Sequence, residues 1–271
     1  MTWVAAVARL RARRESGVLV TVATVRGHAP RDAGAKLVVG RTETWGSIGG
    51  GNVEAVAIDR ARQMISLPAP EPEPELIDFA LNDKVTNRHG VQCCGGTVSV
   101  LLEPLPVVRA VAIFGVGHVG LELARILARM DLDLHLVDSR ADILTKERLD
   151  VLSDAVAQVH VHHTPLLPEE VLEDLPAGTH VLIMTHDHAE DAALCDAALR
   201  TPQLGSIGLI GSAAKWTRFR KRLSTEGGHD DATIDRIKTP IGLPDITGKE
   251  PATIAVSVAA DLLRTFEKER F

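Results

Sequence analysis

Two adjacent thiols are the residues of this chain best suited to do chemistry. Cys93 and Cys94 follow the polar run Asn87–Gly90 and precede Gly95-Gly96, whereas structural cysteines are usually isolated in apolar sequence. Thiolates are soft ligands for transition metals and nucleophiles in sulfur chemistry. The pair therefore predicts metal binding, sulfur transfer or covalent chemistry. Cys195 lies in an alanine-rich helical run and is predicted to be a core residue.

A glycine-dense segment, 46–52, lies about forty positions earlier and opens an apparent helix at 53–65. Flexible backbone N–H groups that lead into a helix N-terminus favour anions. We predict an anion cradle there, with basic side chains flanking it; its residues are Gly49, Gly50, Gly51, Asn52, Arg31 and Lys36. A tight strand-to-helix turn without a ligand is the alternative.

A second glycine motif follows the apolar strand pattern at 107–114 and opens a helix. Its glycines are Gly115, Gly117 and Gly120, and Asp138 ends the next predicted strand. This context matches the dinucleotide fingerprint, in which the acid binds a ribose hydroxyl. The motif predicts a Rossmann-like fold and leaves nucleotide binding open, because the same glycines also serve helix–strand packing.

Several histidines accompany this second pattern. His186 and His188 follow the fourth predicted strand, and carboxyl ends of parallel strands bind ligands. We predict ligand contact at His186, with helix capping as the alternative; a zinc site lacks an evident third ligand. His160, His162 and His163 are predicted to lie on the surface.

The pattern of predicted helices and strands changes near Glu103–Pro106. Residues 1–104 predict a helix at 2–16, short strands and the helix at 53–65, which is an α+β pattern. Residues 105–271 alternate strands at 107–114, 132–137, 156–161, 180–185 and 206–210 with helices, and end in a helix at 251–266. The predicted fold class is α/β: a small N-terminal α+β domain followed by a Rossmann-like parallel-sheet domain.

The composition of the 271 residues excludes several classes of partner. The net charge is −6 and the pI about 6.0, so no nucleic acid or anionic membrane is expected. The basic cluster 215–222 predicts a solvated helix face, with phosphate contact as the alternative. Three cysteines make no disulfide framework, and no run approaches the ~20 apolar residues that span a bilayer. We expect a soluble, cytoplasmic protein.

Many ordered segments resemble the XdhC/CoxI family, accessory factors for molybdenum hydroxylases such as xanthine dehydrogenase. The resemblance covers most of the chain. It rests on Gly27–Arg31, Gly34–Lys36, Gly46–Glu54, Gln92–Gly96, Phe114–Gly120, Val137–Arg140, Met184–Asp187, Ile207–Ser212, Pro240–Pro244, Lys249–Ala252 and Ile254–Ser257. One departure is Ala213-Ala214, where the family often has a more basic segment.

The resemblance implies a homodimeric, non-enzymatic chaperone of purine catabolism. Such a protein carries molybdopterin-bound molybdenum without using it, holds it while a cysteine desulfurase supplies sulfur, and inserts it into apo xanthine dehydrogenase or a related hydroxylase. The family's cysteine before Gly-Gly falls on Cys94, the implied molybdenum ligand, with Cys93 beside it. Molybdopterin offers a phosphate for a glycine cradle and a soft metal for a thiolate.

Two other classes of function compete with this one. An NAD(P)-dependent oxidoreductase would use the second glycine motif with Asp138, but the chain has no tyrosine for a Tyr/Lys proton relay. A thiol redox sensor would use Cys93 and Cys94, but it explains neither the segment 46–52 nor the second domain.

Overall fold

The computed structural model describes residues 1–67, 72–81 and 96–270. It divides into two compact units. Unit 1 comprises Met1–Val107 together with the last residues of the chain from Glu267, and unit 2 comprises Val108–Phe266.

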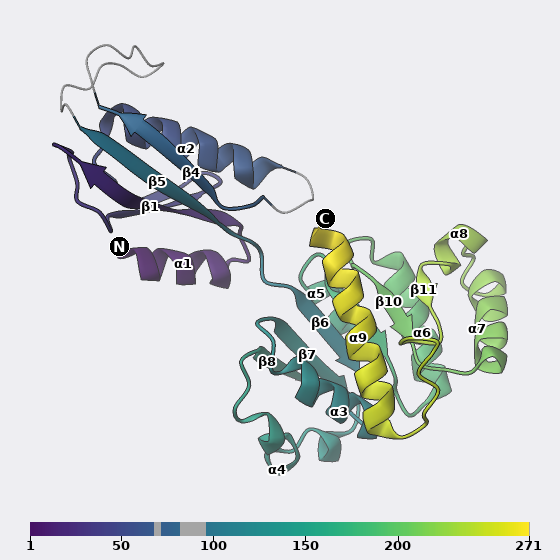
Figure 1. Cartoon of the computed structure of the whole chain (residues 1–271). Helices are drawn as coiled ribbons and strands as arrows, with labels where there is room; N and C mark the ends of the chain where they lie inside the picture. Colours follow the sequence, from purple (N-terminus) through teal and green to yellow (C-terminus); the bar gives the residue numbers. More distant parts are fainter. Residues whose placement is uncertain (68–71, 82–95, 271) are drawn as a thin grey trace. The chain divides into compact units, whose positions relative to one another are not determined.

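Unit 1 is built on a five-stranded antiparallel sheet with the order β3-β2-β1-β5-β4. Figure 1 shows β5 between β1 and β4. The strands are β1 (Gly17–Arg26), β2 (Lys36–Gly40), β3 (Thr44–Gly46), β4 (Glu75–Ala80) and β5 (Thr97–Leu105). Helix α2 (Gly51–Ser66) packs Ala57, Ala61 and Met64 on one face of this sheet. Helix α1 (Trp3–Ala12) packs Ala6 and Leu10 on the other.

Unit 2 contains a six-stranded parallel sheet with the order β11-β10-β9-β6-β7-β8. The strands are β6 (Ala110–Phe114), β7 (Asp133–Asp138), β8 (Gln158–His163), β9 (His180–Ile183), β10 (Ile207–Leu209) and β11 (Ile237–Lys238). From β6 the chain proceeds outward to β8, then returns to β9 on the other side of β6. This is the Rossmann order, and its topological switch point lies between β6 and β9.

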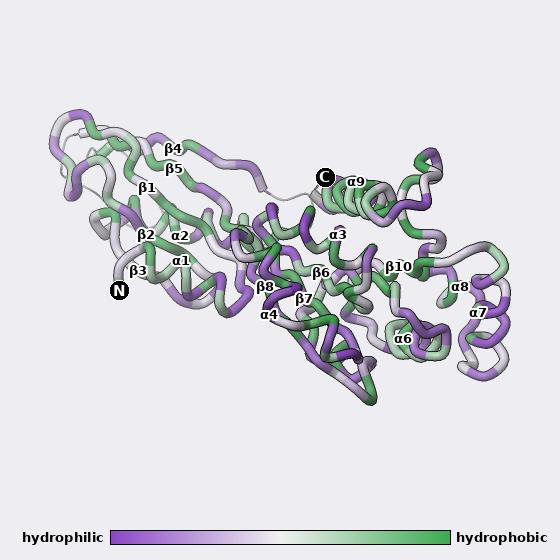
Figure 2. Tube along the Cα trace, turned by 90° about the horizontal axis from the view of Figure 1, so that it is seen from below, coloured by the Kyte–Doolittle hydropathy of each residue, from purple (hydrophilic) through white to green (hydrophobic). Residues whose placement is uncertain are grey.

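Helices cover both faces of the parallel sheet. Helices α3 (His118–Leu127) and α9 (Pro251–Arg270) share one core with it. The other core is formed by α5 (Val171–Asp174), α6 (His188–Arg200) and α7 (Ala213–Thr225). Figure 2 shows β6 as a mainly hydrophobic segment and α7 as a mainly hydrophilic one, as expected for a central strand and a surface helix.

Cys195 lies in the second of these cores and is fully buried, as predicted. Burial raises the pKa of its thiol to about 12. This cysteine is therefore an apolar packing residue and not a reactive one.

The predicted fold class is confirmed, and the differences are local. The helix expected at 2–16 ends at Ala12, because Arg14 has a positive φ of 51°. The strand expected at 156–161 lies at Gln158–His163. The single-turn helices α4 (Lys146–Leu149) and α8 (Asp231–Ile234) were not predicted, since one turn is too short to show a period. Within the described ranges, no helix has the length and apolar character needed to cross a membrane.

Candidate functional site

The glycine-rich turn of unit 1 leads from β3 into α2. Gly49, Gly50 and Gly51 have φ values of 122°, 71° and 64°, a region that glycine adopts at little cost. Gly50 is the N-cap of α2 and has no side chain to bond the first N–H groups of the helix. These groups need another acceptor.

The carboxylate of Glu54 supplies that acceptor by folding back over the turn. Its Oε2 accepts hydrogen bonds from Ser47 Oγ (2.6 Å), Ile48 N (2.9 Å) and Gly50 N (3.0 Å). Burial raises the pKa of Glu54, but these hydrogen bonds outweigh it and hold the pKa below its usual value. The turn thus binds an anion, and in this structure the anion is the protein's own side chain.

The other residues predicted for the cradle lie in different places. A Cβ on Gly49 would meet Arg31 Cγ at 3.3 Å, so Arg31 lies against the turn. Asn52 is buried, and its Oδ1 has no hydrogen-bond partner among the described residues. Lys36 instead lies on the face of the sheet that α1 covers, where its Nζ is 2.9 Å from Thr21 Oγ1 and 5.3 Å from the Trp3 ring centroid. The structure brings Arg31 and Asn52 to the glycine turn, but not Lys36.

The predicted thiols, Cys93 and Cys94, lie outside the described residues. Gly96, which follows them in sequence, is described just before β5. A Cβ on Gly96 would lie 2.3 Å from His28 O and 2.7 Å from Arg26 O, so only glycine fits against this backbone. The glycine turn contacts the same loop, because Gly49 lies against Pro30 and Arg31. The loop 27–31 therefore adjoins both the turn and Gly96, the residue that precedes β5.

The glycine motif of unit 2 connects β6 to α3 beside the switch point. A Cβ on Gly115, which has a φ of 99°, would lie 2.4 Å from Met184 O after β9. A Cβ on Gly120 would lie 2.1 Å from Gly115 O, so this glycine lets α3 approach the strand. Apart from its own chain neighbours, no described residue places a heavy atom within 4 Å of a Cβ position on Gly117. Gly115 and Gly120 thus serve packing, and Gly117 leaves room for a ligand.

Asp138 ends β7, and both oxygens of its carboxylate accept hydrogen bonds from within the protein. Its Oδ1 accepts from Arg140 N (3.0 Å) and Nε (2.9 Å), and its Oδ2 accepts from Arg140 Nη2 (2.9 Å) and Val116 N (2.8 Å). Burial raises its pKa, but these bonds and the charge of Arg140 bring the pKa below its usual value. A carboxylate has about four lone-pair sites, so a ribose hydroxyl would have to displace an existing donor.

Replacing Asp138 by asparagine is expected to lower the free energy of unfolding by about 2 to 4 kcal/mol at pH 7, because Arg140 loses its anion. A group with a depressed folded pKa stabilises above its unfolded pKa of about 3.9, and this contribution is lost as pH falls through the folded pKa. The difference between wild type and variant should therefore shrink at about pH 3. Urea unfolding at both pH values measures it; an equal difference at both would contradict a role for the charge.

His186 lies exposed on the loop after β9, and a buried ion pair organises this loop. Lys215 Nζ on α7 bonds Asp191 Oδ2 on α6 and Ile210 O after β10 (2.9 Å). Asp191 Oδ1 accepts from Thr185 N (3.0 Å) and Thr185 Oγ1 (2.8 Å). The prediction that the basic cluster 215–222 forms a solvated helix face is thus wrong for Lys215, whose exposed fraction is 7%. Its partner Asp191 was missed, since no sequence spacing pairs residues from two helices.

Three histidines of unit 2 form a stack that sequence analysis also missed. The His135 ring on β7 lies 4.6 Å from that of His160 and 5.3 Å from that of His162, centroid to centroid. Burial and then His160 lower the pKa of His162. Of the histidines predicted on the surface, only His163 is exposed. Across the described part of the chain, no three His, Cys, Asp or Glu residues are grouped so as to hold a metal ion.

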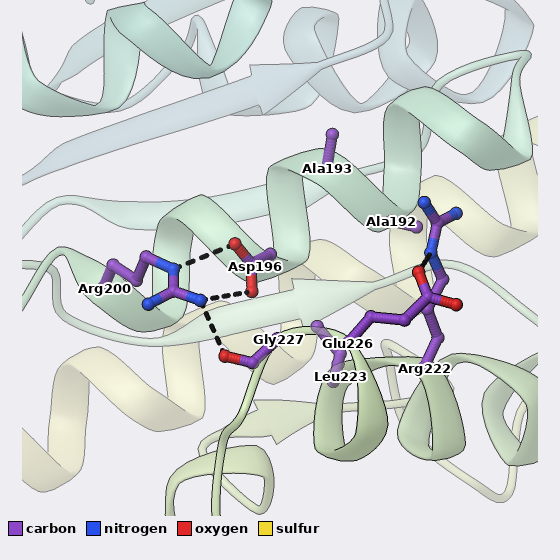
Figure 3. Close-up of a pocket in the computed structure, with 8 residues that line it drawn as sticks. All are labelled: Ala192, Ala193, Asp196, Arg200, Arg222, Leu223, Glu226 and Gly227. Atoms are coloured by element: carbon purple, nitrogen blue, oxygen red, sulfur yellow. Dashed lines mark hydrogen bonds and ion pairs between the residues drawn. The ribbon is translucent and has the colours of Figure 1, made fainter.

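A pocket of about 220 Å³ lies between α6 and α7 (Figure 3). It is lined by Ala192, Ala193, Asp196, Arg200, Arg222, Leu223, Glu226 and Gly227. Its arginines are paired within the wall, Arg200 with Asp196 at 2.9 Å and Arg222 with Glu226 at 2.8 Å. None of the predicted site residues lines it, so it adds no chemistry to the candidate site.

Comparison with known proteins now assigns the family. The protein-family model for the XdhC Rossmann domain matches residues 111–262, which are more than half of the chain. The family model for the XdhC and CoxI family matches residues 10–72. The chain belongs to the XdhC family. The resemblance inferred from its motifs is confirmed, and unit 2 carries the XdhC Rossmann domain.

Two individual proteins resemble this XdhC-family chain. The uncharacterized protein YqeB of Escherichia coli (strain K12) is 26% identical over 239 residues, which are 88% of this chain and 41% of YqeB. The chain therefore spans about two fifths of the length of this curated relative. A crystal structure described as a xanthine dehydrogenase from Bacillus halodurans is 18% identical, with 99% of this chain and 96% of that chain covered and a TM-score of 0.49.

Proposed function

We propose that this chain is an accessory protein that binds molybdopterin-bound molybdenum as cargo, supports its sulfuration and delivers it to an apo molybdenum hydroxylase such as xanthine dehydrogenase. The observation that carries the proposal is membership of the XdhC family in a chain that also has the Cys93-Cys94-Gly-Gly motif. A cysteine desulfurase as sulfur donor, a homodimer and a cytoplasmic location belong to the same proposal.

The geometry of the glycine turn supports a cargo with an anionic end, and the thiols of the sequence motif suit a soft end. The exposed Arg31 and the glycine turn adjoin one loop, and Gly96, which follows the thiol motif in sequence, packs on that loop. Arg31 would attract the phosphate of the pterin. Cys94 would hold the molybdenum, because a thiolate is a soft ligand. Glu54 would have to leave the turn before a phosphate could take its hydrogen bonds.

The alternative, an NAD(P)-dependent oxidoreductase, has less support from the structure than from the glycine motif alone. Its main argument was the pairing of the glycine motif with Asp138 as a ribose-binding acid. Asp138 already accepts four hydrogen bonds from Val116 and Arg140. A ribose hydroxyl would therefore have to displace one of these donors.

Protein purified from cells with an intact molybdopterin pathway is expected to contain roughly one molybdenum and one pterin per chain. The Cys93→Ala/Cys94→Ala variant should lose most of both, while its unfolding free energy stays within about 0.5 kcal/mol of wild type if the thiols lie at the surface. Metal and pterin analysis of the two proteins, purified in parallel, makes the comparison. Full cofactor content in the double variant would make the thiols structural, and substrate-dependent NADH formation by the protein alone would favour the oxidoreductase.

A further inference from the structure

Glu190 occupies a place at the switch point that the proposed function does not use. It lies in the first turn of α6, directly after β9, and its Oε2 accepts a hydrogen bond from Ser139 Oγ at 3.2 Å. Ser139 follows β7, and β6 lies between β7 and β9 in the sheet. The contact therefore spans the end of β6, where the glycine motif begins.

Helix capping does not explain this placement. Asp187 is the N-cap of α6, and Glu190 stands three residues later, where a capping-box glutamate would bond back to the N-cap N–H. That N–H donates instead to Thr185 Oγ1 at 3.2 Å. The side chain of Glu190 turns away from its own helix and toward the carboxyl edge of the sheet.

The charge of Glu190 is only partly compensated by its neighbours, which include His186 and Arg140. Glu190 is half-buried, and the one hydrogen bond to its carboxyl among the described residues is the 3.2 Å contact with Ser139. Burial raises its pKa, the hydrogen bond from Ser139 and the nearby His186 offset part of the rise, and the carboxylates of Asp138 and Asp191 add to it, so that the pKa lies above its usual value. A carboxyl group with a perturbed pKa at a switch point is a functional-site candidate on physical grounds. Asp138, by contrast, has no acceptor to spare.

We propose that Glu190 is the acid that accepts hydrogen bonds from the ribose hydroxyls of a ribonucleotide bound at the carboxyl edge between β6 and β9. The space above Gly117, at the N-terminus of α3, leaves room for the phosphates. Arg148 lies against the same turn, with Nη2 at 3.4 Å from Val116 O, and its buried Nε has no partner within the described residues. Its charge complements a phosphate. The proposal is independent of the cargo of unit 1 and includes no hydride transfer.

The test is calorimetric titration of the full chain with ADP and NAD⁺, each compared with its 2′,3′-dideoxy analogue. Wild type should bind at least one of the two ribonucleotides, and Glu190→Gln should weaken that binding about 10- to 100-fold, the range of one to two charge-assisted hydrogen bonds. Removing the hydroxyls should weaken wild type similarly and cost the variant little more. Glu173→Gln, an exposed glutamate of α5 in the same unit, is the matched control and should bind as wild type does.

Two results would overturn the proposal. One is no heat of binding for either ribonucleotide at millimolar concentration with wild type. The other is equal affinity of wild type and Glu190→Gln when both have the same unfolding midpoint. Molybdenum content measured on the same preparations separates this outcome from the proposed function, because Glu190→Gln should leave it unchanged.

Discussion

Replacing Lys215 by methionine is expected to lower the free energy of unfolding of unit 2 by about 3 to 5 kcal/mol. Asp191 is fully buried, and without the ammonium group its charge would face a low-dielectric core in which Thr185 is its one remaining hydrogen-bond donor among the described residues. The same pair joins α6, α7 and the loops after β9 and β10. The loop that carries His186 should therefore become less ordered in this variant.

Two variants serve as controls for the lysine. Lys221→Met removes a charge from an exposed position of the same helix and should cost less than about 0.5 kcal/mol. The double variant Lys215→Met/Asp191→Asn removes the buried charge as well and should recover part of the loss. Urea unfolding of the three variants provides the measurement. If Lys215→Met and Lys221→Met cost the same, the ion pair has no stabilising role.

Replacing Gly120 by alanine is expected to cost about 3 kcal/mol, at the upper end of the range for overpacking. The added methyl carbon would lie 2.1 Å from Gly115 O, and a backbone oxygen cannot rotate away as a side chain can. Either α3 must move off the sheet or the turn after β6 must open. Thermal and urea unfolding should both show the loss.

Gly117→Ala is the matched variant in the same motif. Its Cβ position is open and its φ is −65°, so alanine fits without a clash. We expect a change within about 1 kcal/mol. Equal losses at Gly120 and Gly117 would contradict the assignment of Gly120 to helix–strand packing.

The fold was largely predictable from the sequence because its signals are local. The apolar run at 107–114, the glycine motif and Asp138 fixed the first β-α-β unit, and the prolines after Glu103 marked the change of rhythm. The short strand β11 was missed, since two residues carry no alternation. The predicted bounds of β8 began and ended two residues too early. His160 and His162 are polar residue types in the sequence, yet their rings stack on His135 in the structure.

The candidate site was less predictable, because its decisive contacts join residues from different elements. The glycine turn was identified, but not that Glu54 fills it, since the same glutamate also suits an ordinary first turn of a helix. Asp138 was identified as an acid at the end of a strand. Its bidentate pairing with Arg140 depends on how the chain bends after β7, which residue types alone do not determine.

The buried thiol of Cys195 has a practical consequence for measuring how unit 2 opens. In the Cys93→Ala/Cys94→Ala background it is the only thiol in the chain, and burial with a pKa of about 12 keeps it from alkylating reagents in the closed core. Each alkylation event then records an excursion in which α6 separates from the sheet. The alkylation rate of Cys195 therefore reports how often the Rossmann unit opens.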